Sequence, residues 1–163
     1  MIDAIWKRRS CRKFKKEKVE EGKILEILRA GFFAPDSMGN KGLEFILIKD
    51  QTTKIKIFDI VGQDFVKVAP ILVIPITDLN KTTEPIQDLS VATENILLEA
   101  TAQGLGSVWK NINSDWQSKI RPLINLPENL TFINLIPIGY PNEELAPHNQ
   151  KNIDQEKIHI EKY

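Results

Sequence analysis

The sequence has very little cysteine and histidine, and it has no long apolar run. Its single cysteine, Cys11, cannot form an internal disulfide, which fits a reducing compartment. Two histidines and one cysteine are too few ligands for a structural zinc site. No apolar stretch approaches the roughly 20 residues of a membrane span. The first six residues contain no Lys or Arg, and the chain becomes basic only after them, which is the reverse of the order in a signal peptide. We therefore expect a cytoplasmic protein with no metal site and no membrane partner.

The chain also lacks an excess of either charge. It carries 22 acidic and 22 basic residues among 163, so no overall field draws it to nucleic acid. That length suits one domain spanning residues 1–163, and no repeat or linker divides it. No Gly-x-Gly-x-x-Gly fingerprint is present, so we expect no Rossmann site that holds NAD permanently.

What the sequence does have is a dense basic run near its start. Eight of the 22 Lys and Arg residues lie between Lys7 and Lys18, with Ser10 and Phe14 set among them. Such a run predicts a bound anion, which composition alone leaves open as a nucleic-acid backbone, a lipid surface or one small phosphate. A solvated charged surface is the remaining alternative.

Apolar spacing and turn residues predict the order of helices and strands. Phe45–Ile48 is a continuous apolar run that predicts a strand buried on both faces in the middle of a sheet. Pro75 suggests an edge or bulge near the end of its strand. Ser114 and Gln117 have the spacing of a capping box. The pattern predicts helices over about 2–8, 19–33, 52–61 and 86–103, and strands over 45–48, 71–76, 106–110 and 131–138. Helices and strands alternate, so we predict a three-layer α+β domain with one mixed sheet.

Four motifs, in order along the chain, resemble those of the nitroreductase family of flavoproteins. The first is Arg8-Arg9-Ser10-Cys11-Arg12-Lys13-Phe14, and the second is Ala34-Pro35-Asp36-Ser37 with Asn40 and the strand after it. The third runs from Glu99-Ala100 through Gly104-Leu105-Gly106 to Trp109, and the last is Ile138-Gly139-Tyr140-Pro141. Together they cover almost the whole chain.

The resemblance implies a fold, a cofactor and an activity. It implies a central mixed, mainly antiparallel sheet flanked by helices, in a homodimer with FMN at the subunit interface. It implies ping-pong hydride transfer from NADH or NADPH, through the flavin, to a nitro compound, a quinone or a similar small acceptor. It also implies that a C-terminal arm, about residues 147–163, wraps the partner subunit.

The resemblance assigns flavin contacts to the basic run. Arg8 and Ser10 match the family's contacts to the FMN phosphate and ribityl chain, and Arg9 lies between them. Arg12 matches a cation near the electron-rich edge of the flavin ring, where a fixed positive charge favours reduction. A guanidinium can hold phosphate through two parallel hydrogen bonds, which suits these residues to the role. The remaining lysines of the run are expected to be ordinary surface.

The other motifs supply further candidates. Pro35, Ser37 and Asn40 match a loop that reaches the partner subunit's flavin, although the Gln-Pro-Trp that usually follows the family's Asn is missing here. The glycine turn and the stretch after it match backbone that covers one ring face and points N–H groups towards N5 and O4; core packing of the tryptophan is an equal alternative. These candidates are Gly104, Leu105, Gly106, Trp109, Lys110 and Asn111.

The C-terminal phosphate contacts of the family are poorly matched. Lys151 is the cation nearest the expected place, with His148 a lesser candidate. No side chain need act as an acid or base, so no catalytic residue is assigned. A flavin-binding or sensing protein with little turnover is one alternative, and a small nucleic-acid-binding protein is a second.

Overall fold

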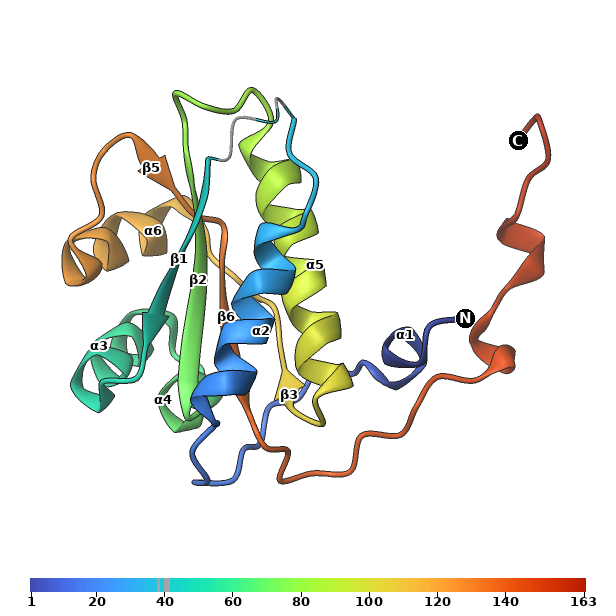
Figure 1. Ribbon diagram of the computed structural model, residues 1–163, viewed down its shortest axis with the longest axis horizontal. Coiled ribbons are helices and arrows are strands. Elements are labelled where there is room, and N and C mark those ends of the chain that lie inside the picture. Colours follow the sequence, from blue (N-terminus) through green and yellow to red (C-terminus); the bar gives the residue numbers. More distant parts are fainter. Residues whose placement is uncertain (38, 40–41) are drawn as a thin grey trace.

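Helices cover both faces of one sheet in the computed structural model, which describes residues 1–37, 39 and 42–163 (Figure 1). Helices α2 and α5 lie on one face, and α3, α4 and α6 lie on the other (Figure 1). The three-layer α+β architecture is therefore confirmed. The α-helices are α1 (Asp3–Lys7), α2 (Glu21–Phe32), α3 (Gln51–Val61), α4 (Asp64–Val68), α5 (Pro85–Ala102) and α6 (Ser114–Ile120). The 3-10 helices are η1 (Arg121–Ile124), η2 (Gln150–Asn152) and η3 (Gln155–Lys157).

The sheet is built from antiparallel ladders in the order β1-β2-β6-β3, with β4 paired to β6 and β5 paired to β2. An isolated parallel bridge also joins Ser10, in the N-terminal segment, to Ser107 of β3. The strands are β1 (Leu43–Ile48), β2 (Ile71–Asp78), β3 (Gly106–Ser107), β4 (Lys110–Asn111), β5 (Leu130–Thr131) and β6 (Asn134–Gly139).

Strand β2 runs through the centre and is buried on both faces. Ile71 and Val73 pack with α2 and α5, whereas Leu72 and Ile74 pack with the helices of the other face. This alternation follows from the two-residue period of a strand. Pro75 lies where β2 is paired with β1 alone, because the pairs with β6 end at Val73 and those with β5 begin at Thr77. Because no strand pairs with that edge of β2 at Pro75, the absence of a proline N–H costs little stability there.

Some boundaries differ from the sequence prediction. Strand β1 lies at the sheet edge and its middle is only half-buried, so the prediction of a central strand was wrong. The predicted strand over 131–138 divides into β5 and β6, and helix α4 was not predicted. The cap of α6 is Asn113, whose Oδ1 accepts from the Trp116 N–H at 2.8 Å. Gln117 donates to Phe132 instead of closing a capping box.

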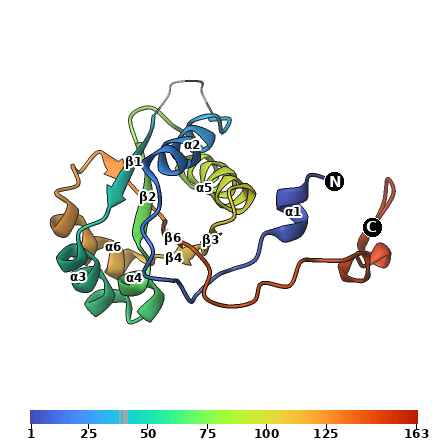
Figure 2. The ribbon, with the colours of Figure 1, turned by 60° about the horizontal axis from the view of Figure 1, so that its bottom comes forward.

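The two ends of the chain leave the main body together. Helix α1 packs on α5, and the chain after Pro141 extends past it as an exposed arm (Figures 1 and 2). The backbone N–H of His148 donates to the Trp6 carbonyl at 2.8 Å and ties the arm to α1. Across the described ranges, none of the helices has the length and apolar character needed to cross a membrane.

Candidate functional site

The basic run forms one wall of a cavity of about 350 Å³. Its lining residues are Arg8, Arg9, Ser10 and Arg12, with His148 contributed by the arm. The structure therefore brings the four predicted residues of the basic run together. No carboxylate is among the described residues that line it. Guanidinium groups beside a hydroxyl suit a phosphate monoester, which carries close to two charges and several acceptor oxygens.

Close packing against β3 fixes the position of this run. Cys11 is fully buried and its N–H donates to the Ser107 carbonyl at 2.9 Å. A Cβ at Gly106 would lie 2.6 Å from both Cβ and Sγ of Cys11, so only glycine permits this approach. Since side chains alternate along extended backbone, burying Cys11 leaves Ser10 and Arg12 exposed on the cavity side.

Cys11 itself is unsuited to nucleophilic chemistry. Burial raises the pKa of its thiol to about 11, with the Glu143 carboxylate adding to the effect. The thiol donates to the Lys13 carbonyl at 3.2 Å. A thiol that stays protonated near neutral pH is a poor nucleophile, so its role is packing.

Glu143 clamps the backbone on the other side of Cys11. Its Oε1 accepts from the N–H of Arg12 at 2.6 Å and from that of Lys13 at 3.0 Å. The hydrogen bond from the Arg12 backbone N–H is the main reason that the pKa of this carboxyl lies below its ordinary value. Nothing in the polar sequence after Pro141 indicated this role for Glu143.

Two contacts reach the guanidinium groups of the cavity. The Arg8 Nε forms an ion pair with Glu94 Oε1 on α5 over 3.7 Å, which is longer than a hydrogen bond. A nitrogen of the Arg9 guanidinium lies 3.1 Å from His148 Nδ1. Because a guanidinium can only donate, His148 Nδ1 accepts, which places the ring hydrogen of a neutral imidazole on Nε2.

A second, more apolar cavity of about 320 Å³ adjoins the first. The two share Arg8 and His148, and Trp6 and Leu98 provide apolar lining. Ile153 of the arm also lines it, as does the Glu94 carboxylate. A charged cavity continuous with an apolar one can hold a ligand with a phosphate at one end and a less polar body.

The glycine turn has a structural role. Gly104 has φ of +76° and ends α5, while Leu105 is buried in the core. Trp109 is half-buried and packs against the α2 and α5 core, as the alternative interpretation stated. The Lys110 ammonium lies 4.1 Å from the centre of the Trp116 ring, and burial lowers its pKa. Asn111 is exposed on β4.

The loop at Pro35 lies near the start of α5, whereas the backbone of the basic run passes near the end of that helix (Figure 1). The Ser37 N–H donates to Asp88 Oδ1 at 2.9 Å, and its hydroxyl lies 3.0 Å from that of Thr82. Asp88, near the start of α5, is buried and organises this loop. Pro35 is exposed, and Asn40 lies outside the described residues. The structure thus divides the predicted site into two separate parts of one chain.

The arm supplies a different residue from the one favoured by the sequence. Lys151 is exposed in η2 and does not line the basic cavity, whereas His148 does. The spacing after Tyr140-Pro141 could not reveal this, since the arm has little periodicity and its path depends on the His148 contact with Trp6.

Comparisons with known proteins agree on one family. A family model described as "Putative TM nitroreductase" matches residues 1–162. The chain is 34% identical over 169 residues to a "Putative NADH dehydrogenase/NAD(P)H nitroreductase" of Methanothermobacter thermautotrophicus, covering all of this chain and 87% of that protein. It resembles the solved structure of an FMN-dependent nitroreductase of Clostridium difficile R20291 with a TM-score of 0.93, 33% identity and full coverage of both chains.

Proposed function

Because this chain belongs to the nitroreductase family, we propose that it is an FMN-dependent oxidoreductase that uses NADH or NADPH. The observation that carries the proposal is the cavity at the start of the chain, where Arg8, Arg9, Ser10 and Arg12 converge with no carboxylate among the described lining residues. The comparisons support the same reaction class, since the similar proteins are named as NAD(P)H nitroreductases and an FMN-dependent nitroreductase.

We assign the FMN phosphate to this basic cavity. Arg8 and Arg9 provide charge-assisted donors, and the Ser10 hydroxyl provides a neutral one. Arg12 lies at the other end of the set, where its fixed charge favours an electron-rich flavin edge. His148 keeps Arg9 in place from the arm. FMN, when bound, supplies hydride-transfer chemistry between NAD(P)H and the acceptor.

The complete site is proposed to form only in a homodimer. The Pro35–Ser37 loop and the basic cavity lie at separate places in one chain, so a second copy is needed for both to contact one flavin (Figure 1). Large apolar side chains are exposed on α1, α2, α5 and the arm, which favours a further interface. They include Ile5, Leu25, Phe32, Phe33, Ile86, Val91, Ile158 and Ile160. The arm, about residues 147–163, is proposed to wrap the partner subunit.

The acceptor class proposed is nitro compounds, quinones and similar small molecules, reduced by a ping-pong mechanism. With no dinucleotide fingerprint for a permanent NAD site, donor and acceptor use the flavin in turn. The protein's contribution is binding, orientation and positive charge, so no acid or base is assigned. A cytoplasmic location stays a prediction from the sequence.

The test is steady-state oxidation of NADH and of NADPH by the FMN-loaded protein, with a quinone and a nitroaromatic compound as acceptors. The proposal expects rates that depend on acceptor, with parallel double-reciprocal plots for a ping-pong mechanism. A protein that holds FMN yet shows no turnover with either donor would instead support the flavin-binding or sensing alternative. A colourless protein that binds nucleic acid in a steeply salt-dependent manner would support the second one.

A further inference from the structure

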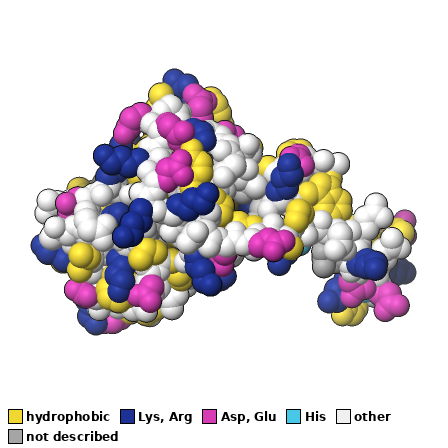
Figure 3. Space-filling model, turned by 90° about the horizontal axis from the view of Figure 1, so that it is seen from below, with side chains coloured by type: hydrophobic (Ala, Val, Ile, Leu, Met, Phe, Trp, Pro, Cys, Tyr) yellow, Lys and Arg dark blue, Asp and Glu magenta, His cyan; other side chains and the backbone are white. Residues whose placement is uncertain are grey.

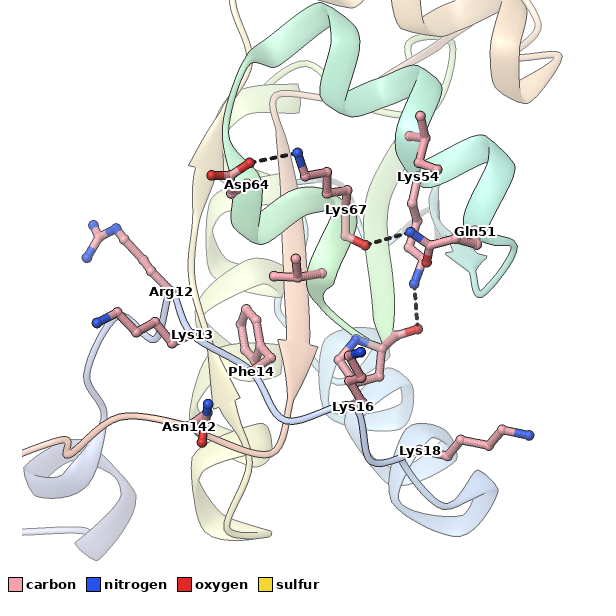
Figure 4. A pocket seen from close by; sticks show the side chains of 13 residues that line it. Arg12, Lys13, Phe14, Lys16, Lys18, Gln51, Lys54, Asp64, Lys67 and Asn142 are labelled. Carbon is pink, nitrogen blue, oxygen red and sulfur yellow. Dashed lines mark hydrogen bonds and ion pairs between the residues drawn. The ribbon is translucent and has the colours of Figure 1, made fainter.

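A larger cavity, of about 780 Å³, lies on the other side of Arg12 between the N-terminal segment and helices α3 and α4 (Figure 4). It shares only Arg12 with the basic cavity assigned to FMN. This volume is within the roughly 300–1,000 Å³ of small-molecule sites. Three lysines of the basic run, Lys13, Lys16 and Lys18, line it and are exposed.

The lining carries a large excess of positive charge. Six cations face one carboxylate, that of Asp64. The Asp64 carboxylate is already 2.8 Å from the Lys67 ammonium, and no second carboxylate is among the described residues that line the cavity. On the face seen from below, several Lys and Arg side chains lie near one another, with Asp, Glu and apolar side chains among them (Figure 3). The six are Arg12, Lys13, Lys16, Lys18, Lys54 and Lys67. Like charges brought together around a hollow favour the binding of an anion.

Lys54 is the least expected member of this set. Its side chain is 4% exposed, and its ammonium donates to the carbonyls of Ala69 at 2.7 Å and Pro70 at 3.2 Å. Among the described residues it has no carboxylate within ion-pair distance. Burial lowers its pKa, because desolvation penalises the ammonium. An ammonium has three donors, so one is left for a ligand oxygen.

The floor of the cavity is apolar. Phe14 lies between the two walls, with Arg12 and Lys13 on one side and Lys54 and Lys67 on the other (Figure 4). Val68 and Ile55 complete the floor and are 47% and 43% exposed. A cationic rim around an apolar floor fits a ligand that combines several negative charges with a flat, weakly polar body. A bare phosphate would not use the floor.

We propose that this cavity binds a nucleotide with two or more phosphate groups, with its base on the exposed apolar floor of Ile55 and Val68 and its phosphates between Lys16 and Lys54. The site is separate from the one assigned to FMN, and it does not depend on that assignment.

The test is calorimetric titration with ADP at low salt, using the FMN-loaded protein so that the first cavity is filled. Lys16→Glu should weaken ADP binding about tenfold or more, because it replaces a charge-assisted contact with repulsion. Lys15→Glu is the matched control: it makes the same charge change one residue away, and Lys15 is exposed but does not line the cavity. Its ADP affinity should change by less than about twofold. Both positions are exposed, so both variants should fold, as thermal melts would verify.

Three results would overturn the proposal. These are no binding of ADP to the unaltered protein, an equal loss in both variants, and binding of inorganic pyrophosphate as tight as that of ADP. The last would show that the apolar floor takes no part. The titration is repeated on unloaded Arg9→Ala protein, in which the first cavity is weakened. Failure of the unaltered protein to take up FMN would therefore refute the proposed function but leave the ADP titration valid.

Discussion

Arg9 donates a hydrogen bond to Nδ1 of His148 over 3.1 Å and so joins two segments separated by 139 positions in the sequence. Beside it, the His148 N–H holds the carbonyl of Trp6. His148 is therefore one of the residues that attach the arm to the cavity wall. The position of the arm and the affinity for a phosphate in this cavity should depend on each other.

The first prediction concerns Arg8 and the phosphate. Arg8→Ala should weaken FMN binding by about tenfold to a hundredfold, the worth of a hydrogen bond to a charged group. Riboflavin lacks the phosphate, so its affinity should change little. Fluorescence titration with both flavins measures the difference. Lys15→Ala is the control, because Lys15 does not line the cavity, and equal losses for FMN and riboflavin would place the phosphate elsewhere.

The second prediction concerns His148. His148→Ala removes the acceptor for Arg9 and frees the arm, so FMN affinity should fall by about threefold to tenfold. Lys151→Ala should have a smaller effect, since Lys151 is exposed in η2 and does not line the cavity. Limited proteolysis provides a second readout, with faster cleavage after position 140 expected for His148→Ala. A larger loss of affinity in Lys151→Ala would contradict the assignment.

The third prediction concerns the close approach of Gly106 and Cys11. Gly106→Ala should lower the free energy of unfolding by about 1–3 kcal/mol, the usual cost of overpacking. The segment carrying Ser10 and Arg12 must shift, so FMN binding should weaken too. Gly22→Ala is the control: nothing lies within 4 Å of the added Cβ in that helix, and the change should be neutral or stabilising. Chemical denaturation measures both variants, and equal stability would refute the account.

The fourth prediction concerns pH and Glu143. Its pKa is held below the ordinary 4.5 by the Arg12 and Lys13 N–H groups, so its contribution to stability is complete above that value. The contribution is lost as the pH falls through the lower folded value. Glu143→Ala should be less stable by about 1–2 kcal/mol at neutral pH. That difference should shrink as the pH falls below about 4.5 and through the lower folded value. A difference independent of pH would show that the carboxylate charge has no part.

The fold was largely predictable because its core elements have regular apolar patterns. Strand β2 and helix α5 are examples, with α5 ended by Gly104 as expected. Strand β1 was wrongly predicted to be central, because the same apolar run can form a strand with a neighbouring strand on one edge or on both edges. Helix α4 is too short for a period to be detected.

The candidate site was predictable only where a motif marked it. The basic run could be identified, and the structure brings its predicted residues into one cavity. The partners that position it could not, since Glu143, Glu94 and His148 come from segments whose packing no local pattern reveals. That Lys16 and Lys54 line one cavity could not be predicted, because this depends on the packing of α3 beside the N-terminal segment.

The most direct test of the central claim is the visible absorbance spectrum of the FMN-loaded protein under anaerobic conditions, before and after addition of NADH or NADPH. The account predicts an oxidised flavin band that bleaches with at least one donor and returns when a quinone or nitroaromatic acceptor is added. A protein that takes up no FMN, or a band that neither donor changes, would contradict it.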